Sequence, residues 1–114
     1  MAIPYFQDTI FQTDSALSAI GVGTALQVAV NNTFNTKDYT LLATVATINT
    51  NVKVSLEGSI DGTNYAEIIS EKTITANGTT AYNVSHTPVR WIRPRFISET
   101  GGTAATVVFS VAAS

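Results

Sequence analysis

Apolar and polar residues alternate along most of this chain with a period of two, which is typical of β-strands that bury one face. The clearest example is VKVSLE at positions 52–57, where Val52, Val54 and Leu56 alternate with polar residues. Asp61-Gly62 follows and predicts a tight turn, because Gly tolerates positive φ and an Asp side chain can bond its own downstream backbone. The pattern therefore predicts an all-β protein with a hairpin at this point.

The same alternation predicts strands from residue 24 to the end of the chain. Asn77-Gly78 is the strongest two-residue hairpin signal, because a type I′ turn needs positive φ at both positions, and we expect the segments before and after it to pair. Pro94 falls inside a predicted strand and should occupy a position whose N–H is not needed, or a bulge. The predicted strands are 24–30, 39–48, 52–57, 65–69, 71–76, 79–84, 89–97 and 103–111. About eight strands joined by short turns predict a single antiparallel β-sandwich that is jelly-roll-like.

Residues 1–23 differ from the rest, because their large apolar side chains follow no clean period. We interpret this segment as an N-terminal arm and residues 24–114 as the β-sandwich domain. Two forms of the arm fit the sequence. Asp14-Ser15 can cap a single helical turn that Gly21 ends, or the segment can lie extended along a neighbouring subunit.

Charged residues make up 12% of the chain, about half of the usual share. A surface wetted by hydroxyls and amides suits permanent contact with neighbours, because burying Thr costs less than burying an unpaired charge. The formal net charge of −2 argues against a nucleic-acid partner. Neither an export signal nor a run long enough to span a bilayer is visible, so we expect synthesis in a host cytoplasm and no membrane contact.

The residues suited to catalysis or metal binding are few. His86 is the one histidine, so a catalytic triad would have to be built around it, and the interpretation that we favour is a solvated loop histidine. With no second histidine and no cysteine, a transition-metal site cannot be completed. The Asp61-Gly62-Thr63-Asn64 segment superficially resembles a calcium loop but lacks the spaced carboxylates and the distal Glu. Glu57 and Glu67 can lie opposite each other across the predicted hairpin, where they are expected on its wet face. We therefore expect no catalytic residues, no metal and no cofactor.

Three arginines flank Trp91 in the segment VRWIRPRF at 89–96. With a period of two, Arg93 and Arg95 share the face of Trp91. Such a group can bind a phosphate or stack on a base. The interpretation that we favour is pairing with acidic residues, because the net charge is negative. The candidate partners are Glu57, Glu67 and Glu71.

Two segments resemble known families. LEGSIDGTNY at 56–65 resembles a hairpin of discoidin-like and carbohydrate-binding jelly rolls, although Tyr65 stands where Trp is frequent, and VRWIRPRF resembles the strand that ends those domains. Together with the turn at Thr100-Gly101-Gly102 and a final apolar strand, they are similar to small structural proteins of tailed bacteriophages. The resemblance covers roughly residues 52–113 and implies a β-sandwich rather than an activity.

The resemblance to phage proteins implies a non-enzymatic virion protein, most specifically a capsid decoration (cement) protein that binds and stabilises the assembled shell. The expected partners are the major capsid protein or other virion proteins, and the expected form is a homo-oligomer such as a trimer. The candidate partner contacts in the N-terminal arm are Tyr5, Phe6, Ile10 and Phe11.

Two alternatives remain open from the sequence. A tail or baseplate component is a close variant of the first hypothesis. The other is a carbohydrate-binding module for host adhesion, in which loop residues at one end of the sandwich would bind a glycan. The candidate ligand residues for that module are Asp61, Asn64 and Tyr65, with Trp91 as a further aromatic contact.

Overall fold

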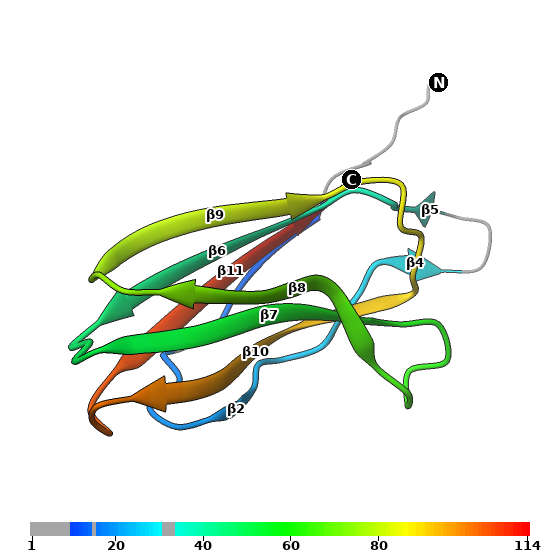
Figure 1. Cartoon of the computed structure of the whole chain (residues 1–114). Coiled ribbons are helices and arrows are strands. Elements are labelled where there is room, and N and C mark those ends of the chain that lie inside the picture. The colour runs from blue at the N-terminus through cyan, green and yellow to red at the C-terminus, as the bar shows by residue number, and fades with distance from the viewer. Residues whose placement is uncertain (1–9, 15, 31–33) are drawn as a thin grey trace.

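The computed structural model describes residues 10–14, 16–30 and 34–114, and the regular elements in this part of the chain are all strands (Figure 1). The predicted all-β class is confirmed. The strands are β1 Ile10–Thr13, β2 Gly21–Val22, β3 Leu26–Gln27, β4 Ala29–Val30, β5 Phe34–Asn35, β6 Tyr39–Ala46, β7 Asn51–Ser59, β8 Ala66–Ile74, β9 Gly78–Val84, β10 Trp91–Thr100 and β11 Thr106–Ala113.

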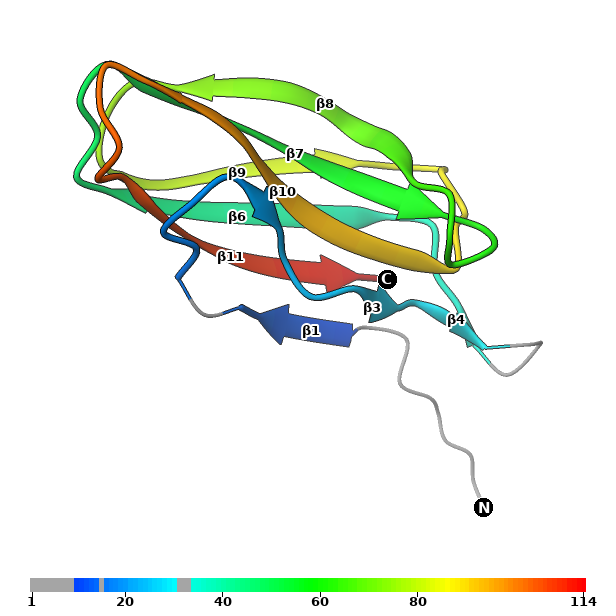
Figure 2. The same cartoon turned by 90° about the horizontal axis from the view of Figure 1, so that it is seen from below.

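The long strands form two antiparallel sheets that pack face to face (Figures 1 and 2). In the first, which we call sheet A, the strand order is β1-β11-β6-β9. In the second, sheet B, the order is β2-β10-β7-β8, and β3 also pairs with β10. From β6 to β11 every connection crosses between the sheets except the β7–β8 hairpin. This is the connectivity of a jelly roll, so the predicted sandwich architecture is confirmed.

The core lies between the two sheets and follows directly from the alternation in the sequence. On β6 and β11 every second residue is buried, and β10 buries Ile92, Pro94 and Phe96. Burial of these apolar surfaces is the main favourable term in folding. The largest fully buried hydrophobic side chains include Tyr39, Leu41, Leu56, Ile92, Phe96 and Phe109.

The described part of the predicted N-terminal arm lies in the two sheets. β1 pairs with β11 from Ile10↔Ala113 to Thr13↔Ser110, and β2 pairs with β10. Leu17 forms a bridge with Val107, so residues 16–20 form no helical turn. The extended form of the segment is therefore the one observed, and between residues 10 and 22 it pairs with this chain's own strands.

One predicted strand division and one predicted strand pairing are wrong. The segments 65–69 and 71–76 are one strand, β8, because a shift of register keeps the chain paired with β7. Asn77-Gly78 does not close a hairpin: β8 belongs to sheet B, whereas β9 pairs with β6 in sheet A. Gly78 has the positive φ of 126° that the turn signal implies, but Asn77 does not share it. The turn signal correctly predicted a reversal, but it did not specify the strand with which the next segment pairs.

Pro94 lies in the middle of β10, as predicted. Its carbonyl oxygen accepts a hydrogen bond from the Gly23 N–H at 2.8 Å. The N and C=O of one residue point to the same side of a strand, so the missing N–H of Pro94 faces the break between β2 and β3. The expectation of a position that needs no N–H is confirmed.

Candidate interaction surfaces

Sheet A contains no charged residue on any of its four strands. Its outward-facing side chains form rows across the sheet, for example Phe11–Ala112–Thr40 and Thr13–Ser110–Leu42. We call this surface the uncharged face. It consists of Phe11, Thr13, Thr40, Leu42, Thr44, Ala46, Thr79, Ala81, Asn83, Thr106, Val108, Ser110 and Ala112.

The uncharged face has an apolar centre near β1. Phe11 is 74% exposed and Leu42 is 37% exposed, with a shallow depression between them. Several hydroxyls of the face already have partners, because Thr13 bonds Ser110 at 3.1 Å and Thr44 bonds Thr79 at 2.9 Å. A partner that covers these hydroxyls leaves each of them with one hydrogen-bond partner in place, which lowers the cost of docking.

The outer face of sheet B has the opposite chemistry. The carboxylate of Glu57 accepts a hydrogen bond from Arg93 Nε at 2.7 Å and another from Arg95 Nη1 at 3.3 Å. Lys53 and Glu71 form a further ion pair at 3.1 Å. The predicted pairing of the arginines with acidic residues is confirmed for Glu57, as is the predicted position of Glu57 opposite Glu67. The expected wet face is confirmed for Glu67 but wrong for Glu57, which is buried beneath the arginines.

The β7–β8 loop is ordered by the side chain of Asp61. Its Oδ1 accepts hydrogen bonds from the backbone N–H groups of Thr63 and Asn64, both at 2.8 Å, and its Oδ2 accepts one from Asn64 Nδ2 at 2.7 Å. These bonds, the backbone bond from Asn64 first, hold the pKa of the Asp61 carboxyl well below its usual range. Gly62 takes a φ of 81° in the predicted turn.

The aromatic residues beside this loop are also engaged within the protein. The guanidinium carbon of Arg93 lies 3.8 Å from the centroid of the Tyr65 ring, and that of Arg90 lies 5.8 Å from the Trp91 ring. The Trp91 ring also lies against Gly62. Sugars stack on free ring faces and bond to free acceptors, so these internal contacts of Asp61, Asn64 and Tyr65 weigh against a glycan site at this loop.

The predicted partner contacts are divided between described and undescribed residues. Tyr5 and Phe6 lie outside the described residues. Ile10 and Phe11 lie in β1, where Ile10 packs against the core and Phe11 projects from the uncharged face. The other residues of this face were missed in the sequence. The signal was present as four charge-free segments, 10–13, 39–46, 78–84 and 106–113, but only the fold places them side by side.

His86 lies in the exposed β9–β10 loop, where its backbone N–H donates to Asp38 Oδ1 at 3.1 Å. Over residues 10–14, 16–30 and 34–114, no cluster of three His, Cys, Asp or Glu side chains has the geometry to hold a metal ion. The described residues likewise contain no helix long and apolar enough to cross a membrane.

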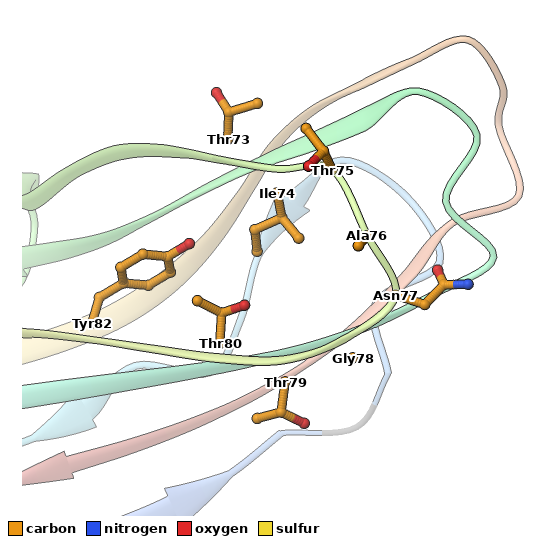
Figure 3. A pocket seen from close by; sticks show the side chains of 9 residues that line it. All are labelled: Thr73, Ile74, Thr75, Ala76, Asn77, Gly78, Thr79, Thr80 and Tyr82. Atoms are coloured by element: carbon orange, nitrogen blue, oxygen red, sulfur yellow. The ribbon is translucent and has the colours of Figure 1, made fainter.

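A second depression lies where β8 passes into β9 (Figure 3). The side chains of Thr80 and Tyr82 project from β9 toward β8, and Ile74 projects toward β9. The residues that line it are Thr73, Ile74, Thr75, Ala76, Asn77, Gly78, Thr79, Thr80 and Tyr82. None of these residues carries a charge, so the depression continues the uncharged character of sheet A to the end of the sandwich.

No family model and no curated protein matches this sequence. Among solved structures, the chain is similar to the SPBc2 prophage-derived protein YomS, with a TM-score of 0.60 at 9% sequence identity over 100% of both chains. At this identity the likeness shows the fold alone. A protein of Bacillus endospore appendages, described as disulfide-linked pili, aligns over 100% of this chain and 98% of its own at 10% identity with a TM-score of 0.41, and that weaker likeness carries no weight.

Proposed function

We propose that this chain is a non-enzymatic structural protein of a tailed-phage virion, and specifically a decoration protein that binds the outside of the assembled capsid. The observation that carries the proposal is the separation of charge between the two sheets. Sheet A offers an uncharged face with Phe11 exposed, while sheet B carries the paired charges of the sandwich. In this proposal sheet A docks and sheet B faces solvent.

The size of the uncharged face sets the strength of docking. The 27 residues of its four strands, at about 3.3 Å per residue with strands about 4.8 Å apart, cover about 430 Å². Docking through the whole face therefore buries about 900 Å² in total, which is below the size of most stable protein interfaces and corresponds to weak binding by each copy.

The mechanism is mass action. A protein that binds the assembled shell but not the free capsid subunits stabilises the shell by the free energy of that binding. The uncharged face suits such a contact because it can be dehydrated without leaving a buried, unpaired charge. The fold of a prophage-derived protein and the resemblance of residues 52–113 to phage structural proteins support this setting. Such a protein would be made in the host cytoplasm and reside in the virion.

The first test is the location of the protein in particles purified from a lysate of the phage that encodes it. Immunogold label on the heads supports the decoration role. Label on the tails overturns that role in favour of a tail or baseplate component. Absence of the protein from purified particles overturns the virion assignment itself.

The second test is co-sedimentation of purified protein with particles stripped of it. Leu42→Glu places a carboxylate on the uncharged face and should weaken binding at least tenfold, because docking must then bury an unpaired charge. Thr73→Glu adds the same charge to the outer face of sheet B, beside Lys53, and should bind as the parent does. Equal binding by both variants contradicts docking through sheet A, provided that thermal unfolding shows both to be folded.

The contribution of the N-terminal residues needs a truncation that spares β1. Removal of the first dozen residues would strip the strand that covers the edge of β11. Deletion of residues 1–9 leaves β1 intact and removes Tyr5 and Phe6. We expect weaker co-sedimentation without a change in the unfolding midpoint. Undiminished binding would remove these two residues from the interface.

A further inference from the structure

The sandwich has four exposed strand edges, and three of them have features that discourage pairing with another chain. β8 carries Glu67, Glu71 and Lys72 and has two register shifts against β7. β2 and β3 are two residues each and β1 is four. Charges, bulges and shortness are the usual means by which proteins protect the edge of a sheet.

The edge strand β9 has none of these features. Its seven residues, Gly78–Val84, include no charge and no proline, and its register with β6 runs unbroken from Tyr39↔Val84 to Val45↔Gly78. Among the described residues, no backbone hydrogen bond joins β9 to any segment other than β6. Alternate N–H and C=O groups of an edge strand point away from its sheet, and β9 lies at the margin of sheet A (Figure 1).

We propose that β9 pairs antiparallel with β9 of a second copy of this chain, around a two-fold axis at Ala81. An antiparallel pair of identical strands is self-complementary, so a two-fold axis suffices to form it. Ala81 is the midpoint of Gly78–Val84, so this register uses the whole strand in both copies. It also keeps outward-facing residues opposite outward-facing ones, as a continuous sheet requires. This inference does not depend on the proposed function.

The side chains of β9 are compatible with such a pair. On the outer face Ala81 meets its own copy and Thr79 lies opposite the partner's Asn83, so no like charges face each other. Lys72 of β8 contacts the strand only through the ring of Tyr82, with Nζ 5.7 Å from the ring centroid, and it belongs to sheet B. The product is an eight-stranded sheet in which the two uncharged faces form one continuous surface.

Light scattering tests the pairing directly. The protein should have twice the 12.1 kDa mass of the chain. Ala81→Lys and Ala81→Glu should each give monomers, because two like charges then meet at the axis, and an equimolar mixture should recover the dimer. Ala46→Lys adds the same charge to the same face at a residue that β9 does not reach, and it should remain a dimer. Thermal unfolding confirms that the variants are folded.

Cross-linking tests the register. The chain contains no cysteine, so Ala81→Cys introduces one thiol per copy, and directly opposite Cβ atoms about 4.5–5.5 Å apart are near the span of a disulfide. Mild oxidation should convert Ala81→Cys to a covalent dimer and leave Ala46→Cys monomeric on a denaturing gel. A monomeric or trimeric parent protein, or a dimer that survives Ala81→Lys, would overturn the inference.

Discussion

Glu57 accepts a hydrogen bond of 2.7 Å from Arg93 Nε, and the register of β7 with β10 places the two residues directly opposite each other. Glu57 is 6% exposed because it lies on the central strand of sheet B. Its other neighbour in the register is Glu67, a like charge. The arginines on β10 therefore compensate a carboxylate that would otherwise be buried and unpaired.

Glu57→Gln should lower the free energy of unfolding by about 2 kcal/mol, because it removes the charge that both arginines bond while keeping the side-chain shape. Urea unfolding measures the change. Glu67→Gln is the matched control, because Glu67 lies opposite Glu57 but is exposed, and it should change stability by less than about 0.5 kcal/mol. Equal effects of the two substitutions would contradict the role assigned to the ion pair.

Asp61 should make stability depend on acidity below pH 4. Its pKa is lowered in the folded protein relative to 3.8, chiefly by the backbone bond from Asn64. The contribution of Asp61 to folding stability is therefore fully present above the ordinary pKa of 3.8, and it is lost as the pH falls through the lower pKa of the folded protein. Asp61→Asn retains an acceptor but cannot titrate, so its urea midpoint should fall less between pH 4 and pH 2 than that of the parent. An equal fall of the urea midpoint in the parent and in Asp61→Asn would contradict this prediction.

Thr47 has a φ of 60° in the exposed turn between β6 and β7. This left-handed conformation costs an L-residue about 1–2 kcal/mol, and a β-branched residue adopts it rarely, whereas Asn tolerates it. Thr47→Asn should therefore stabilise the protein by about 1 kcal/mol and raise the unfolding temperature by about 4 °C. Thr75→Asn is the matched control, because Thr75 is exposed in the β8–β9 turn but has a negative φ. This substitution should leave the unfolding temperature unchanged.

Gly23 lies where a side chain has no room. A Cβ at this position would lie 2.7 Å from Pro94 Cγ and would clash with Asp14 Oδ2. Gly23→Ala should cost about 2 kcal/mol or more, because the backbone bond from Gly23 to Pro94 must shift. Gly21→Ala, in the same segment with no atom within 4 Å of the added carbon, should be close to neutral. Thermal unfolding of the two variants measures how much stability each substitution costs.

The alternation at 52–57 and the Asp61-Gly62 turn predicted a hairpin that the structure contains as β7 and β8. The β6 and β11 patterns likewise predicted buried faces. These predictions succeed because burial alternation and turn geometry are local properties, set by neighbouring residues. Asn77-Gly78 misled for the same reason: a turn signal specifies that the chain reverses, but not which strand the next segment joins.

The candidate sites likewise combine features that the sequence predicts with features that only the fold decides. Phe11 was identified by its size alone, but its position on the uncharged face depends on the pairing of β1 with β11, about 100 residues away along the chain. The sequence predicts Tyr65 and Asp61 as ligand groups of a carbohydrate-binding module, whereas the fold engages both within the protein. Tyr5 and Phe6 remain predictions, as does the division of the chain at residue 23.

The sequence by itself determined the all-β class, the buried faces of the long strands and the scarcity of charge, because these depend on residue type and on a period of two. Only the tertiary structure decided that the four charge-free strands belong to one sheet and that β9 is its unprotected edge. Strand order is set by contacts between residues far apart in the chain, and the packing of the two sheets around a shared core selects it.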